Sequence, residues 1–292
     1  MHDDLSYFIH PLGTYSSRCS LRMAAFEREF LRGQFPGADD GPMYEYEVIR
    51  HHQATVDGDP ESPKLPGGGW LTDNDLQSWG PDREAYRWTM LHTNNRDTDD
   101  YDQIIAVQGL FGQPAATFAQ GAQALLDMEQ WSRTLAFMSL VGPGDGALTG
   151  GGGIHNFRLY VRPDDGRTLF MPWDWDSAFQ RPTNASLFGV GNIFKAATAT
   201  PDFRRRYLAH MCDLCDSVFN TAYMSRWTTH YGDVADEDFG GRLSYIGQRR
   251  DTVMAQLPLA TTFTASAGTP DANGAVVLSG TAAMKVVGIV VN

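Results

Sequence analysis

The sequence predicts an α+β protein, and three observations carry that prediction. Apolar residues recur at helical spacing over residues 118–140 and again after Thr200. Two runs of strand-forming residues, 154–161 and 168–173, flank a turn, which is the pattern of one β-hairpin. Near the end, from residue 261, the chain becomes rich in Thr, Ala, Val and Gly. Helices, a single hairpin and a short β-rich tail are therefore expected in that order.

The composition is typical of a folded chain and argues against several classes of protein. Of the 292 residues, 42% are hydrophobic and 20% are charged, which suffices for a core and does not favour disorder. The formal net charge of −12 argues against a nucleic-acid partner, because phosphate binding needs a basic patch. No run of about 20 apolar residues is present, so no membrane span is expected. Residues 1–19 lack the basic start and apolar stretch of a signal peptide.

The first helical run predicts one amphipathic helix over residues 118–140. Its apolar face carries Met128, Trp131, Leu135 and Met138. The Gly-Pro-Gly-Asp sequence that follows ends the helix and opens a loop. This places the carboxylate of Asp145 on a loop directly after a helix.

The hairpin brings an amide and two carboxylates together. Its turn is the Pro-Asp-Asp-Gly sequence at 163–166. With that turn, residues whose numbers sum to about 330 face each other, so Asn156 is expected opposite Asp174, with Cβ atoms roughly 5 Å apart. Asp176 follows two residues later. Such a set of hard oxygen ligands suits Mg²⁺.

These residues predict phosphoryl transfer, which needs metal ligands, positioned phosphates and an oriented nucleophile. Asp145 is the carboxylate that would orient the attacking hydroxyl. Alternation along the strand predicts that Trp173 and Trp175 pack against the helices while Asp174 and Asp176 face the site.

The second helical run predicts a helix capped by Thr200, with Pro201 in its first turn. The spacing of its apolar residues places Cys212 and Cys215 near the buried face, so we interpret this Cys-x-x-Cys as structural and not as a redox or metal site. The chain has three cysteines, too few for a disulfide framework.

The C-terminal tail alternates over residues 275–283 like the opening strands of a β-sandwich. Two or three strands cannot bury a core alone, so the tail is expected to be the start of a truncated β-rich domain.

The order Asp, Asn, hairpin, Asp is also that of the catalytic and metal-binding residues of protein kinases. Beyond that order, the residues Asp-Gly at 145–146, His-Asn-Phe-Arg-Leu-Tyr at 155–160 and Met-Pro-Trp-Asp-Trp-Asp at 171–176 closely resemble the CotH kinase family. The mark of that family is an aromatic-rich Pro-Trp-Asp-x-Asp segment after an Asn-bearing strand. The resemblance extends to segments 26–31, 35–44, 200–220 and 248–250.

The resemblance implies an atypical protein-kinase-like fold over residues 24–258, mainly a helical C-lobe with a catalytic hairpin. Residues 1–23 form a divergent N-terminal segment and residues 259–292 the truncated β-rich domain. It implies transfer of the ATP γ-phosphate to Ser or Thr of a coat or surface protein, with Mg²⁺ or Mn²⁺. By resemblance Asp145 is catalytic, Asn156 and Asp174 bind the metal and nucleotide, and Asp176 is a further metal ligand. The parent protein is expected outside the cell, on its surface or in a spore coat.

Two features depart from the family pattern. The interval between Asp145 and Asn156 is long and contains four consecutive glycines, 150–153. No Gly-rich phosphate loop can be placed. No N-lobe lysine can be placed either, because the only lysines in the sequence are Lys64, Lys195 and Lys285. The chain is therefore expected to be a fragment with an incomplete N-lobe.

Two other functions remain open from the sequence. The same residues could belong to a non-catalytic coat or surface module that binds a divalent ion. Alternatively, Asp174 and Asp176 could form the carboxylate pair of a carbohydrate hydrolase, since residues two apart on one strand face are about 6.6 to 7 Å apart. For His51, His52 and His155, surface or hydrogen-bonding roles are preferred to metal binding, since they form no cluster at ligand spacing.

Overall fold

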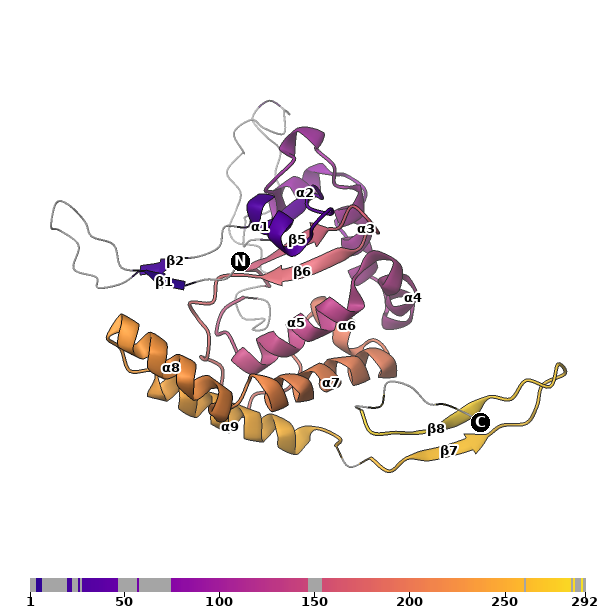
Figure 1. Ribbon diagram of the computed structural model, residues 1–292. Coiled ribbons are helices and arrows are strands. Elements are labelled where there is room, and N and C mark those ends of the chain that lie inside the picture. The colour runs from indigo at the N-terminus through magenta and orange to yellow at the C-terminus, as the bar shows by residue number, and fades with distance from the viewer. Residues whose placement is uncertain are drawn as a thin grey trace.

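The computed structural model describes residues 4–6, 20–22, 26, 28–46, 57, 75–146, 154–259, 261–284, 286 and 290. The described residues form a mixed α and β structure, which confirms the predicted α+β class (Figure 1). Its strands are β1 (Asp4–Ser6), β2 (Ser20–Arg22), β3 (Met43–Tyr46), β4 (Met90–His92), β5 (Phe157–Val161), β6 (Thr168–Pro172), β7 (Thr264–Ala267) and β8 (Leu278–Thr281). Its helices are α1 (Arg28–Gln34), α2 (Glu84–Thr89), α3 (Asp102–Phe111), α4 (Ala115–Leu125), α5 (Met128–Val141), α6 (Lys195–Thr198), α7 (Pro201–Ser217), α8 (Thr221–Ala235) and α9 (Gly240–Gln256), with 3₁₀ turns η1 (Arg96–Thr98) and η2 (Asn192–Phe194).

The central sheet has four antiparallel strands in the order β4-β3-β5-β6. The predicted hairpin is confirmed as β5 and β6, joined through the turn at 163–165. Its register differs by one residue from the prediction: Phe157 pairs with Pro172, so the ladder places Asn156 beside Trp173 and not opposite Asp174. The reason is that Val161 pairs with Thr168, which centres the turn between Asp164 and Asp165 and not on Asp165. Just beyond the ladder, the Trp173 amide donates to the Asn156 carbonyl oxygen at 3.0 Å.

The expected single helix over 118–140 is two helices. Leu126 is extended, with ψ 143°, and pairs with Thr168 of β6, so the chain leaves α4 there. Asp127 then begins α5, since its carboxylate accepts a hydrogen bond from the Gln130 amide at 3.1 Å. The apolar spacing continues through this break, which is why the period alone suggested one helix.

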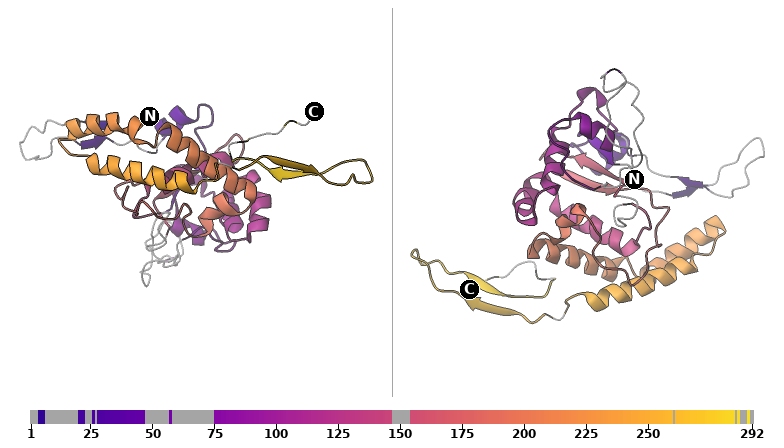
Figure 2. Two further views of the ribbon diagram at one scale, coloured as in Figure 1. Left: turned by 90° about the horizontal axis from the view of Figure 1, so that it is seen from below. Right: turned by 180° about the vertical axis from the view of Figure 1, so that it is seen from behind.

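Both faces of the sheet are covered. The main core lies between one face and the helices, and it contains fully buried Trp131, Phe157 and Phe170. On the other face, Leu31 of α1 packs with residues of β3, β5 and β6. α9 contributes Tyr245, Ile246 and Val253 to the main core, and α8 packs on α9 to form a hairpin whose far end projects from the body (Figure 2). The loops described below begin at the ends of α5 and β6, so the packing of the helices on the sheet determines where these loops lie.

The α7 prediction is confirmed in detail. The Thr200 hydroxyl accepts a hydrogen bond from the Phe203 amide at 3.1 Å, and Pro201 is in the first turn. Cys212 and Cys215 are buried, and burial raises the pKa of the Cys215 thiol to about 12. A buried thiol with a raised pKa is a weak nucleophile at neutral pH, and no group of three or more His, Cys, Asp or Glu residues that could hold a metal ion occurs among the described residues, which supports the structural interpretation.

In the tail, β7 and β8 form an exposed two-stranded ladder. None of the helices built from described residues has the length and apolar content needed to cross a membrane.

His92 makes the stability of the sheet pH-dependent. The imidazole is buried and stacked on Tyr44, with ring centroids 4.7 Å apart. Neither ring nitrogen has a hydrogen-bond partner among the described residues, and burial lowers the pKa of His92, against a smaller opposite effect of Asp100 and Asp99. The unfolded chain therefore binds this proton more readily, so stability is lost as pH falls below about 6.5.

We expect His92→Phe to remove this loss. The free energy of unfolding of the unmutated protein should decrease when the pH is lowered from 7.5 to 5.5. His92 contributes at most about 1.4 kcal/mol to this decrease for each pH unit below the ordinary histidine pKa. Urea denaturation at both pH values measures it. An equal pH dependence in parent and variant would contradict the assignment.

Candidate functional site

The candidate site is formed by two loops, one after α5 and one after β6. The Phe179 amide donates to the Val141 carbonyl oxygen at 2.9 Å, and the Gln180 amide donates to that of Gly142 at 3.1 Å. Gly142 ends α5 in the left-handed region, with φ 58°, and a Cβ there would lie 2.3 Å from the Tyr245 hydroxyl. A glycine is therefore required where the first loop turns toward the second.

Asp145 is fixed on the first loop by contacts from the second loop and from the hairpin. Its amide donates to the Ser177 hydroxyl at 3.1 Å, while the Gly144 amide donates to the Ser177 carbonyl oxygen at 2.8 Å. Its Oδ1 accepts from the Gly146 amide at 2.9 Å and lies 3.1 Å from Nε2 of buried His155. The side chain is nevertheless 53% exposed. One side of the carboxylate is anchored, and the group stays accessible to a substrate.

Asn156 and Asp174 flank the open end of the hairpin. Both have left-handed backbones, with φ 61° and 58°, a conformation that Asn and Asp tolerate better than most residues. Asn156 is buried against the first loop, because a Cβ at Gly146 would lie 3.3 Å from its own Cβ. The structure therefore brings Asn156 beside the Asp145 loop. The Trp173 amide donates to the Asn156 carbonyl oxygen, and Asp174 directly follows Trp173 in the chain, so Asp174 also lies at this end of the hairpin.

Asp174 and Asp176 lie in a loop and not on a strand face. β6 ends at Pro172, and Asp174 has a left-handed backbone, so the strand spacing assumed for a hydrolase carboxylate pair is wrong. Asp174 is half-buried and Asp176 is exposed. Within the described part of the chain, neither carboxylate has a hydrogen bond or an ion pair with another side chain.

The donor chemistry of this loop pair suits a hard divalent cation. Two carboxylates without an internal partner and one amide are oxygen ligands of the kind Mg²⁺ uses, with water and phosphate oxygens completing the shell. A cluster of three or more His, Cys, Asp or Glu residues does not occur among the described residues, so the set depends on the Asn156 amide.

The two tryptophans point to different parts of the molecule. Trp175 packs edge-on against Phe137 of α5, with ring centroids 5.4 Å apart, as expected for packing on the helices. Trp173 instead lies by the Arg158 guanidinium, 4.9 Å from its ring centroid. Arg158 is paired with Glu45 across the sheet at 3.0 Å. The expectation that both tryptophans pack on the helices is therefore wrong for Trp173.

Several sequence candidates lie away from this site or outside the described residues. Lys195 donates to the carbonyl oxygens of Phe111 and Gln113, both at 2.6 Å, and so joins α6 to the end of α3. Lys64, Lys285, the glycines at 150–153 and the His51-His52 pair fall outside the described residues.

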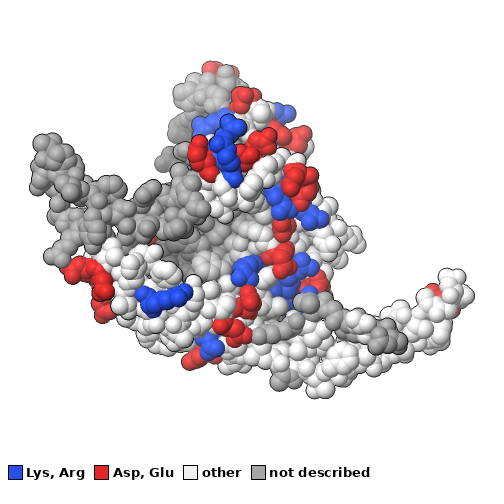
Figure 3. Space-filling model, in the orientation of Figure 1, with Lys and Arg blue, Asp and Glu red and all other residues white. Residues whose placement is uncertain are grey.

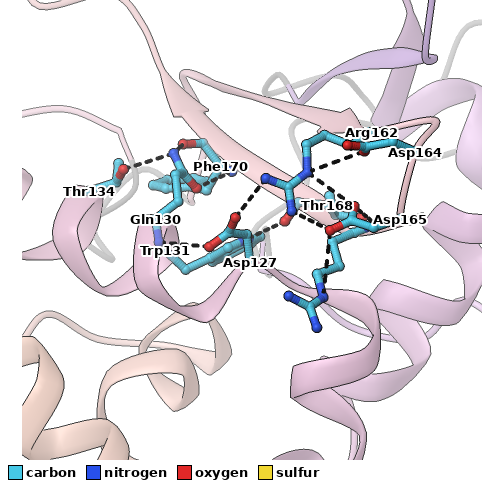
Figure 4. A network of polar contacts seen from close by, with 10 residues as sticks. Asp127, Gln130, Trp131, Thr134, Arg162, Asp164, Asp165, Thr168 and Phe170 are labelled. Atoms are coloured by element: carbon cyan, nitrogen blue, oxygen red, sulfur yellow. Dashed lines mark hydrogen bonds and ion pairs between the residues drawn. The ribbon is translucent and has the colours of Figure 1, made fainter. Parts of the chain in front are cut away.

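A polar network fixes the hairpin to the start of α5 (Figure 4). Asp127 accepts from Arg162 at 2.9 Å, and Trp131 Nε1 donates to the Thr168 carbonyl oxygen at 2.8 Å. Gln130 bonds both backbone groups of Phe170, accepting at 2.9 Å and donating at 2.5 Å. Because α5 leads to Asp145 and the hairpin carries Asn156 and Asp174, this network sets one half of the site relative to the other.

The sequence did not single out Ser177 or the contact of His155 with Asp145. Both depend on contacts between residues far apart in the chain, Ser177 with Asp145 and His155 with the same carboxylate. The only local signal was position: Ser177 directly follows the Asp-x-Asp segment, and His155 directly precedes Asn156.

Comparison with known proteins gives one family. The family model described as CotH kinase protein matches residues 21–236. No curated protein matches the chain.

Proposed function

Since the chain belongs to the CotH kinase family, we propose that it transfers the γ-phosphate of ATP to Ser or Thr of coat or surface proteins. The observation that supports this proposal is that the Asp145 loop contacts both Ser177, in the loop after β6, and Asn156, directly before β5. Membership of this family also supports a spore-coat or cell-surface setting for the protein. We assign the kinase-like domain to residues 24–258 and the β-rich tail to residues 259–292.

In the proposed reaction Asp145 orients the acceptor hydroxyl and takes its proton. His155 holds the carboxylate in place from the buried side, at 3.1 Å. Asn156 and Asp174 would hold Mg²⁺ or Mn²⁺, with Asp176 as a further ligand. When bound, the cation neutralises charge on the transferring phosphate.

A second candidate is a non-catalytic coat or surface module that binds a divalent ion through the same residues. It is favoured by Lys195, which is engaged with carbonyl oxygens of the helical body and so is not free to contact nucleotide phosphates. ATP binding separates the two candidates.

The test is thermal and urea unfolding with Mg²⁺ or Mn²⁺, with and without ATP. We expect stabilisation that needs both metal and ATP, about 2.7 kcal/mol at 100 times the dissociation constant. Asp174→Asn should abolish it, since the variant loses a charged metal ligand. The matched control is Asp251→Asn, on α9, where the side chain is 79% exposed. That control should respond like the parent.

Asp145→Asn separates binding from chemistry. It should keep the stabilisation by metal and ATP and lower the rate of phosphate transfer by about 10²- to 10⁴-fold, since the proton acceptor is lost. Transfer of labelled phosphate measures this rate. Unchanged transfer in Asp145→Asn would defeat the role of Asp145, and absence of any ATP effect in the parent would favour the non-catalytic module.

A further inference from the structure

An apolar groove begins at the candidate site and follows α8 and α9. Its first hollow, of about 290 Å³, includes Trp175, the residue between Asp174 and Asp176. Its second hollow, of about 380 Å³, includes Trp227. The two hollows share Phe179, Met224 and Ile246, so they are continuous.

The groove leaves aromatic surface open to solvent. Phe137, at the first hollow, is 38% exposed, and Trp227, in the second, is 37% exposed. Contiguous apolar surface of this kind marks binding sites more often than isolated exposed residues do. Among the described residues that line these two hollows, Arg242 is the only Lys or Arg, so the hollows offer little positive charge to bind phosphate groups.

The far end of the groove is acidic. A third hollow, of about 640 Å³, shares Thr228 and Phe239 with the second. The described residues that line it include Asp233, Asp236, Glu237 and Asp238, and none of them is Lys or Arg. Figure 3 shows acidic side chains gathered at the end of this projecting helical hairpin. The groove thus changes from apolar near the site to negative away from it.

Resting on the proposed function, we propose that this groove binds the phosphoacceptor polypeptide in an extended conformation. Apolar side chains beside the acceptor Ser or Thr occupy the two apolar hollows, and basic side chains further along lie against the acidic end. Charge complementarity and continuity with Trp175 favour such a chain over a second copy of this protein, whose net charge is −12.

The length of the groove sets the spacing of the two features. Met224 and Asp236 are about 18 Å apart along α8, at about 1.5 Å per residue. An extended peptide covers that length with about five or six residues. Basic residues are therefore expected about that far beyond the apolar ones.

The test measures the binding of labelled Ser-containing peptides by fluorescence anisotropy, in the absence of ATP. One peptide carries Leu next to Ser and Arg about six positions away. Two matched peptides replace Leu by Ala or Arg by Gln. We expect each replacement to weaken binding, the Leu change by about tenfold. Equal affinity for all three peptides would overturn the proposal.

Protein variants locate the binding. Met224→Glu should weaken binding of the Leu peptide by about tenfold or more, and Trp227→Ala, at an exposed position, should weaken it without affecting folding. The control Ser225→Glu makes the same charge change on an exposed neighbour that does not line the groove. Equal effects of the Met224 and Ser225 variants would overturn the proposal. So would a dimer in sedimentation that only Met224→Glu dissociates. Peptide binding is measured without ATP. Its outcome therefore does not depend on whether the protein transfers phosphate, and the two proposals can fail separately.

Discussion

Replacing Arg249 by Met is expected to destabilise the protein by about 3 to 5 kcal/mol. Arg249 is 1% exposed, and its guanidinium donates to the carbonyl oxygens of Thr183, Ala185, Ser186 and Ser139, at 2.6 to 3.3 Å. Met fills a similar volume but donates nothing, so these carbonyl oxygens lose a donor inside the protein. The free energy of unfolding in urea measures the loss.

The neighbouring Arg250 provides the control. It is half-buried and donates to the Cys215 carbonyl oxygen at 3.3 Å and to exposed Asp251 at 3.4 Å. Arg250→Met should cost less than about 1 kcal/mol. If both variants lost the same stability, Arg249 would not be the anchor described. Since the segment that Arg249 holds follows directly on the Asp176 loop, Arg249→Met should also weaken the stabilisation by metal and ATP.

The elements predicted from sequence are those with local signals. The hairpin follows from the Pro-Asp-Asp-Gly turn between two runs of strand-forming residues, and α7 follows from Thr200 and Pro201 at its start. No local signal predicts β3 and β4, because strands of four and three residues are too short to show a period; they form by pairing across the sheet. The break between α4 and α5 was also missed, although Asp127 is a residue type that caps helices.

For the candidate site, the order of residues in the sequence predicts which segments come close together but not how their backbones are arranged. Asp145, Asn156 and Asp174 do lie on loops that meet, as the sequence order suggested. The register differs by one because Val161 pairs with Thr168, so the turn is centred half a residue earlier than the prediction placed it. The left-handed backbones of Asn156 and Asp174 then take both residues out of the ladder. Backbone conformation of this kind is imposed by the contact between the two loops, so the pattern of side chains could not reveal it.

Trp131→Ala is expected to lower the free energy of unfolding by about 3 to 5 kcal/mol, as for other large buried aromatic residues. Trp131 is fully buried and stacked on Phe170 of β6, with ring centroids 4.9 Å apart. It also lies 5.3 Å, centroid to centroid, from Phe111 of α3. The substitution leaves a cavity among these rings and removes the bond to the Thr168 carbonyl oxygen. Urea unfolding measures the change.

Two further tryptophan variants show which contact matters. Trp131→Phe keeps a ring but loses the Nε1 donor, so it should cost clearly less than the Ala variant, because the Thr168 carbonyl oxygen still accepts from the Asp127 amide at 3.2 Å. Trp227→Ala, at a position 37% exposed, should change stability little. Trp131 lies between the helix that leads to Asp145 and the strand that leads to Asp174, so Trp131→Ala should also reduce the response to metal and ATP. If Trp131→Ala lost the expected stability but the folded variant kept the full response to metal and ATP, the network of Figure 4 would support the fold without positioning the site.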